Sequence, residues 1–134
     1  MIPVTLAALG LFFVQSLLPS SIRYLQSREQ LGENLGIALR GRDDPPPMPV
    51  LGGRAQRALI NLGEGLVVFL PLALLMEVHG LGDGVGGAAA WAYVGIRAVY
   101  VPAYLSAIPG LRSTVWVAGV GALGVMGWQL LSAA

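Results

Sequence analysis

The chain contains no cysteine and no lysine, and it is poor in charge of either sign. Of its 134 residues only 11% are charged, whereas 55% are hydrophobic. The absence of cysteine excludes disulfide bonds and thiolate metal sites. A chain this apolar, with so few charges, is typical of an integral membrane protein rather than of a soluble domain.

Histidine is almost absent as well. The single residue, His79, follows an apolar run and precedes Gly80. An isolated histidine in that place is more commonly a residue at the C-terminal end of a helix than a metal ligand. We therefore predict no metal site, and we expect no nucleic-acid partner.

Long apolar segments make up most of the chain. A membrane-spanning helix needs about 20 apolar residues. Four segments meet this requirement: residues 2–22, 59–79, 86–108 and 114–132. The longest connector, residues 23–53, is too short to bury a core of its own. We predict a single all-α domain, residues 1–134, forming an integral membrane bundle of four helices.

The arginines are distributed unevenly among the connectors. Six of the eight lie in or beside the first connector: Arg23, Arg28, Arg40, Arg42, Arg54 and Arg57. Arg112 lies between the third and fourth segments, whereas residues 77–84 contain acids and no arginine. Because arginine-rich connectors face the cytoplasm, both termini are predicted to lie outside it. The first segment has no basic residue before it, so we expect a retained span and not a signal peptide.

The connectors have distinct compositions. Leucines spaced among polar residues in 25–39 predict a weakly amphipathic helix at the cytoplasmic surface. Residues 40–53 contain consecutive prolines, which lack backbone donors, and they predict a fixed loop. Residues 80–87 are rich in glycine and predict a tight turn.

The second segment begins with a polar face. Arg57, Asn61 and Glu64 are spaced i, i+4, i+7, which places them on one side of a helix. Glu64 lies about one turn inside the expected hydrocarbon boundary, where an ionisable group is costly unless it has a partner. We therefore expect a paired Glu64 and a binding site on this face.

The third segment carries a second polar face. Arg97, Tyr100 and Tyr104 are spaced i, i+3, i+7. Arg97 needs an anionic partner within the membrane, and Glu64 is the carboxylate that we place within a span. The pair is interpreted either as part of a ligand site or as a structural ion pair that fixes helix packing.

Two stretches, GRDDPPPMPVLGGRAQRALINLGE from Gly41 and RAVYVPAYLSAIPGLRS from Arg97, resemble the MAPEG superfamily, the membrane-associated proteins in eicosanoid and glutathione metabolism. The similarity extends to the order of four short spans, and it is greatest to bacterial members. It implies a homotrimer that binds glutathione between adjacent subunits, toward the cytoplasmic side. By motif position, the implied glutathione-binding residues are Arg57, Asn61, Glu64, Arg97, Tyr100 and Tyr104.

The resemblance also implies a catalytic residue. Arg112 resembles the arginine near the start of the fourth helix that stabilises the glutathione thiolate. A cation beside sulfur lowers the thiol pKa and raises the fraction of nucleophile at neutral pH. Glutathione offers two carboxylates for arginines and an ammonium group for Glu64.

Two functions from different classes follow. The first is a glutathione-dependent membrane transferase and peroxidase of the bacterial inner membrane, which takes lipophilic electrophiles from the bilayer. The second is a non-catalytic trimer that binds lipid in its subunit crevice, with Glu64 and Arg97 only locking helices together. A proton or ion path is disfavoured because such relays use several ionisable groups within the membrane. The electrophile is not specified by the sequence.

Overall fold

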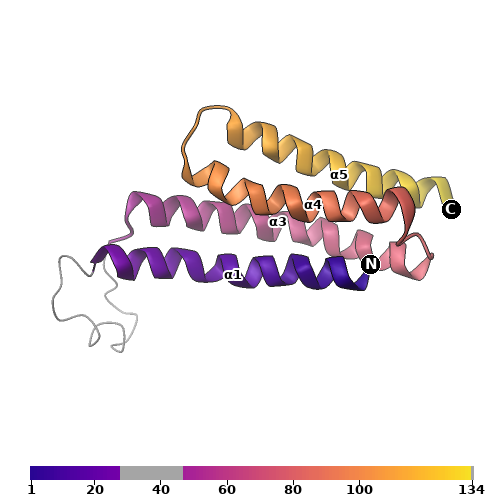
Figure 1. The fold of residues 1–134 in the computed structure, drawn as a ribbon, viewed down its shortest axis with the longest axis horizontal. Coiled ribbons are helices and arrows are strands. Elements are labelled where there is room, and N and C mark those ends of the chain that lie inside the picture. Colours follow the sequence, from indigo (N-terminus) through magenta and orange to yellow (C-terminus); the bar gives the residue numbers. More distant parts are fainter. Residues whose placement is uncertain (28–46, 134) are drawn as a thin grey trace.

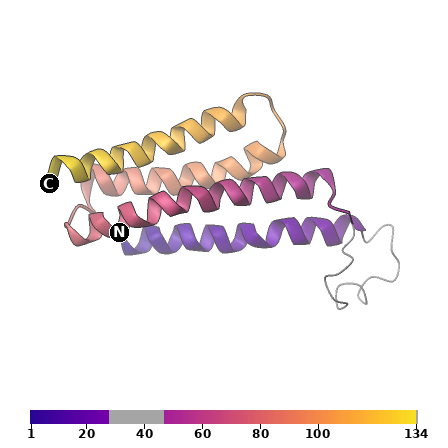
Figure 2. The ribbon, with the colours of Figure 1, turned by 180° about the vertical axis from the view of Figure 1, so that it is seen from behind.

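The computed structural model describes residues 1–27 and 47–133. Its described helices are α1 (Ile2–Ser27), α3 (Val50–Val78), α4 (Gly84–Leu105) and α5 (Leu111–Ala133). They lie side by side with alternating directions, so that both termini are at the same end of the bundle (Figures 1 and 2). The all-α four-helix bundle is confirmed. The predicted surface helix beyond Ser27 and residues 40–46 of the proline-rich loop lie outside the described residues.

Three of these helices, α1, α3 and α5, are long and apolar enough to cross a membrane. The protein is therefore an integral membrane protein. The fourth, α4, has 22 residues, among them Arg97, and is not one of the three helices that meet this requirement. It lies between α3 and α5 along their length (Figure 1). The crossing of the membrane by α4 stays a prediction.

The core lies where α1 and α4 pack against α3. Large side chains of α3, among them Phe69 and Met76, are fully buried against small residues such as Ala8 and Ala90. The Phe69 ring stacks on Tyr93 of α4, with centroids 4.8 Å apart and an interplanar angle of 11°. Small residues permit this close approach of the helices. The van der Waals contacts that result stabilise helix association within a membrane. The outer faces carry exposed valine, leucine and tryptophan, as lipid contact requires.

The start of α3 differs from the sequence prediction. The helix begins at Val50, so residues 50–53 are helical and not part of a loop. Pro49 precedes the first turn, where a fixed φ suits helix entry, and its carbonyl accepts a hydrogen bond from Gly53 N at 2.9 Å. The helix therefore begins about one turn before Arg54, and Arg54 lies on the same helix as Arg57, Asn61 and Glu64.

The glycine-rich turn is shorter than predicted. It ends at Gly84, and Gly86 and Gly87 are buried inside α4. A Cβ on Gly86 would contact the Met76 side chain and lie 2.8 Å from the Leu81 carbonyl oxygen. Gly86 therefore permits close packing of α4 on Met76 at the end of α3, and Gly87 permits close approach of the turn at Gly82. The prediction of a turn through Gly87 was wrong.

The connection between α4 and α5 shapes the site. It comprises residues 106–110, because α4 ends at Leu105 and α5 begins at Leu111. Two residues in it adopt left-handed backbone conformations, Ala107 with φ 59° and Gly110 with φ 82°. Gly110 has no Cβ and adopts this conformation without strain. The sharp reversal places Arg112 in the first turn of α5, facing α3.

Candidate functional site

Six of the seven predicted site residues line one cavity of about 280 Å³, the central cavity. They come from three helices and are Arg57, Asn61 and Glu64 of α3, Tyr100 and Tyr104 of α4, and Arg112 of α5. The two polar faces expected from the sequence are thus brought together. Hydroxyl, amide, carboxylate and guanidinium groups in one cavity provide donors and acceptors for a zwitterionic ligand.

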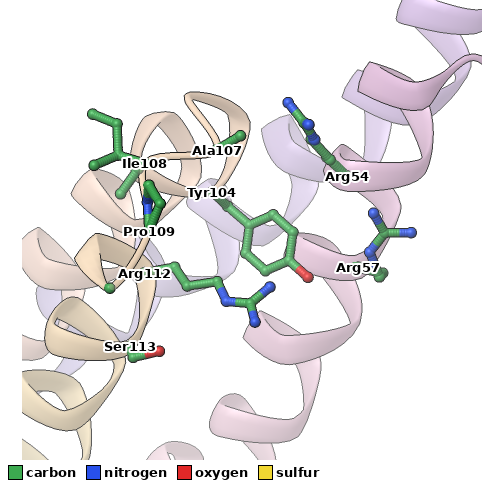
Figure 3. A pocket seen from close by; sticks show the side chains of 10 residues that line it. Arg54, Arg57, Tyr104, Ala107, Ile108, Pro109, Arg112 and Ser113 are labelled. Atoms are coloured by element: carbon green, nitrogen blue, oxygen red, sulfur yellow. The ribbon is translucent and has the colours of Figure 1, made fainter.

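Aromatic contacts position Arg112. Its guanidinium carbon lies 5.6 Å from the Tyr104 ring centroid, a cation–π contact. The Tyr104 ring in turn lies 5.6 Å from that of Tyr100, tilted by 58°. Figure 3 shows Arg112 reaching from α5 toward Tyr104, with Arg54 and Arg57 of α3 on the other side of the ring. The guanidinium is therefore held at the cavity wall.

The seventh residue, Arg97, does not line the central cavity. It is only 3% exposed, and its Nη1 donates a hydrogen bond to Asn61 Oδ1 at 2.8 Å. Its guanidinium carbon lies 5.1 Å from the Tyr93 ring centroid and 5.6 Å from that of Tyr100. Arg97 thus supports Asn61 and Tyr100 from behind the cavity.

The expected ion pair between Glu64 and Arg97 is not formed in the part of the chain that the structure describes. The ion pair found there joins the Met1 amino group to Glu77 Oε2 at 2.7 Å. Asn61 lies on the same face of α3 as Glu64, three residues earlier, and its Oδ1 accepts the Arg97 hydrogen bond. Glu64 is instead exposed. Within one chain, Glu64 therefore has no ion-pair partner among the described residues.

Two residues beside Arg97 were missed from the sequence. Tyr93 is fully buried, and its ring lies against the guanidinium. A Cβ on Gly65 would meet the Tyr93 hydroxyl and lie 2.6 Å from Arg97 Nη2. Tyr93 precedes Arg97 by four residues, which places both side chains on one face of a helix. This spacing is the signal from which Tyr93 could have been identified. Nothing in the sequence marked Gly65 as the residue that makes room for the guanidinium.

An apolar chamber of about 560 Å³ adjoins the central cavity. It shares Asn61 and Glu64 with that cavity, and Arg97 lies at its polar end. Its other walls come from α3 and α5 and are Gly65, Val68, Trp116, Val120, Leu123 and Gly124. A polar cavity and an apolar one therefore meet at Asn61 and Glu64.

A third cavity, the outer cavity of about 400 Å³, lies at the α4–α5 turn. It is lined by Arg54, Arg57, Tyr104 and Arg112, by Ala103, by turn residues 107–110 and by Ser113 of α5 (Figure 3). It is continuous with the central cavity, because both include Arg57, Tyr104 and Arg112. Arg54 was not among the predicted site residues, since it lies a turn before the motif.

The comparison with protein families gives one match. The model of the MAPEG family matches residues 3–132. Searches of curated proteins and of solved structures found no match. Because the match covers nearly the whole chain and the motif residues converge between α3, α4 and α5, the protein belongs to the MAPEG family, which acts in glutathione and eicosanoid metabolism.

Proposed function

We propose that the protein is a glutathione-dependent membrane transferase that also reduces lipid hydroperoxides. The observation that carries the proposal is the convergence of Arg57, Glu64 and Arg112, with two tyrosines, in the central cavity. This set matches a ligand with two carboxylates, one ammonium group and a thiol.

Glutathione is proposed to bind along α3. Glu64 accepts the ammonium group, and Arg57 binds a carboxylate. Asn61 and the hydroxyl groups of Tyr100 and Tyr104 supply neutral hydrogen bonds. Arg97 acts through Asn61, whose amide it holds at 2.8 Å, and does not itself reach the ligand.

Arg112 is proposed to stabilise the thiolate. Its guanidinium lowers the pKa of the bound thiol, so the proton leaves to solvent and the sulfur becomes nucleophilic at neutral pH. In transfer, the sulfur forms a bond to an electrophilic carbon, and the leaving group departs with the electron pair of the broken bond. In peroxide reduction, the thiolate attacks the terminal peroxide oxygen and the O–O bond breaks, which gives a sulfenic acid and an alkoxide that takes a proton from solvent to become the alcohol. A second glutathione then yields the disulfide and water.

The electrophile is proposed to come from the bilayer. The apolar chamber offers valine, leucine and tryptophan walls, and it meets the central cavity at Asn61 and Glu64. Such walls bind by contact area and exclude water, with few directional contacts. The fitting substrate class is therefore apolar electrophiles, including lipid hydroperoxides.

A homotrimer in the bacterial inner membrane, with both termini outside the cytoplasm, completes the proposal. In one chain Arg57, Glu64 and Arg112 are all exposed, so the central cavity needs a cover to exclude water from the thiolate. We propose that a neighbouring subunit of the trimer covers the cavity. The apolar helix faces that point outward from the trimer then contact lipid.

The proposal is tested by turnover. The protein in nanodiscs is mixed with glutathione and 1-chloro-2,4-dinitrobenzene, and thioether formation is followed by absorbance. Cumene hydroperoxide is assayed in parallel through glutathione disulfide. We expect saturable glutathione-dependent turnover with at least one of them. A well-folded protein that turns over neither of them, nor an apolar epoxide, at any glutathione concentration would contradict the proposed activity.

A further inference from the structure

We propose that the protein binds one phospholipid with a primary ammonium headgroup in a cavity between α1 and α3, with the ammonium group at Glu77. This cavity, the α1–α3 cavity of about 250 Å³, lies at the end of the bundle where both termini are found (Figures 1 and 2). It shares no lining residue with the central cavity, the outer cavity or the apolar chamber. The inference is therefore independent of the proposed thiol chemistry.

The walls of the α1–α3 cavity are apolar, and both helices are able to cross a membrane. Ala73 is buried, whereas Ile2, Leu6 and Leu74 are each more than 60% exposed, so the cavity opens outward toward lipid. Its volume is below the roughly 300–1,000 Å³ of sites for drug-sized ligands, and it therefore fits one acyl chain better than a bulky ligand. The lining residues are Met1, Ile2, Thr5 and Leu6 at the start of the chain and Leu70, Ala73, Leu74 and Glu77 of α3.

The polar and apolar parts of the cavity follow the order of a phospholipid. Glu77 is the residue before the last one of α3, and Leu70 lies seven residues earlier, which is about 10 Å deeper along the helix. The cavity thus runs from the helix end, where a carboxylate reaches the headgroup region, into the apolar part of the span. A lipid bound with its headgroup at Glu77 therefore has its acyl chain against leucine and isoleucine.

The charge at this end of the bundle favours an ammonium group. Residues 77–84 contain two carboxylates, Glu77 and Asp83, and no arginine. The Glu77 side chain is 44% exposed, and its Oε2 lies 2.7 Å from the Met1 amino group. An ionised carboxylate has about four acceptor positions, so this contact leaves positions for a ligand. Two carboxylates beside one amino group also disfavour a lipid whose headgroup is anionic.

Hydrogen bonding distinguishes the headgroups that carry a cation. A primary ammonium group has three N–H donors, whereas the trimethylammonium group of a choline lipid has none. A hydrogen bond between two charged groups is stronger than one between neutral groups. Among common phospholipid headgroups, phosphoethanolamine therefore fits the Glu77 carboxylate best, and the proposed ligand is a phosphatidylethanolamine.

The test compares phospholipids with identical oleoyl chains and an ethanolamine, choline or glycerol headgroup. Native mass spectrometry of the purified protein in mild detergent measures the fraction that carries an added lipid. We expect wild type to bind the ethanolamine lipid about tenfold more tightly than the other lipids. Glu77→Gln is expected to bind all of them within about twofold. Asp83→Asn is the matched control, at an exposed acid of the same end that does not line the cavity, and it should keep the preference.

A second pair of variants tests the position of the lipid. Leu6 lines the cavity and is 63% exposed, whereas Leu9 of the same helix is 42% exposed and does not line it. Neither side chain belongs to the hydrophobic core, so Leu6→Trp and Leu9→Trp are both expected to fold. The indole at position 6 blocks the cavity. We expect Leu6→Trp to abolish the tenfold preference and Leu9→Trp to keep it.

Several outcomes overturn the inference. Equal binding of the lipids by wild type is one, and a preference that persists in Glu77→Gln is another. Loss of the preference in Asp83→Asn as well would assign it to the overall charge of this end and not to the cavity. A preference that survives in Leu6→Trp overturns the inference too, and a simultaneous loss of the oligomer would identify a second copy of the chain as the occupant. Should Glu77→Gln fail to fold, the wild-type ratio and the two tryptophan variants still decide.

Discussion

Replacing Gly87 by valine is expected to destabilise the bundle by about 3 kcal/mol or more. A Cβ at this position would overlap the Gly82 carbonyl oxygen and lie 3.1 Å from the Gly82 carbonyl carbon. Those atoms belong to the backbone of the short turn between α3 and α4, so they cannot rotate away as a side chain would. The expected result is a large fall in melting temperature and in yield from membranes, measured by circular dichroism of the purified protein.

Gly95→Val is the matched control. Gly95 lies on the same helix, and nothing comes within 4 Å of a Cβ placed there. The β-branched side chain brings the same local helix cost at both positions. The control is therefore expected to melt close to wild type. Equal destabilisation by the two substitutions would show that close approach at the turn does not hold the bundle together.

Arg112→Ala is expected to lower the rate of thiol transfer at saturating glutathione by about 100-fold at pH 6.5. Without the guanidinium, the pKa of the bound thiol returns toward its ordinary value of about 8.5. At pH 6.5 that leaves about 1% thiolate, whereas the thiol bound to wild type is expected to be largely ionised. Because the lost factor is ionisation, raising the pH to about 9 should restore most of the rate. The measurement is kcat against pH.

Arg112→Lys separates charge from shape. A lysine keeps the cation but lacks the planar guanidinium that lies 5.6 Å from the Tyr104 centroid. Its pH profile is expected to stay closer to wild type than that of Arg112→Ala. An Arg112→Ala rate equal to wild type at pH 6.5, or a loss that is the same at every pH, would remove Arg112 from the proposed thiolate role.

Helical spacing made the polar faces predictable. Arg57, Asn61 and Glu64 share a side of any continuous helix, and so do Arg97, Tyr100 and Tyr104. These six residues and Arg112 were expected in one site. The structure brings six of the seven, all except Arg97, into the central cavity. The ligand and the roles of these residues are proposals.

The partner of Arg97 was not predictable in the same way. Asn61 and Glu64 lie on one face of α3, less than a turn apart, and both are acceptors. The choice depends on the rotation of α4 against α3 and on the space at Gly65, where a Cβ would lie 2.6 Å from Arg97 Nη2. The spacing of residues along one helix specifies neither the rotation of α4 against α3 nor the space at Gly65.

Two helix starts that contain glycine were predicted as a loop and a turn. Residues 50–53 and Gly86–Gly87 have the composition of a loop or turn, yet they are helical. A glycine that permits close packing and a glycine that forms a turn are the same letter in the sequence. Only the position of the neighbouring helix, here Met76 and Leu81 beside Gly86, distinguishes them.

Calorimetric titration of glutathione into wild type and Glu64→Gln tests the central claim most directly. The substitution keeps the size and hydrogen-bonding capacity of an exposed side chain, so the fold should be unchanged and only the partner of the ammonium group is lost. We predict saturable binding by wild type and at least about tenfold weaker binding by the variant. No binding by a well-folded wild-type oligomer, or equal binding by both proteins, would contradict the account of the central cavity as a glutathione site.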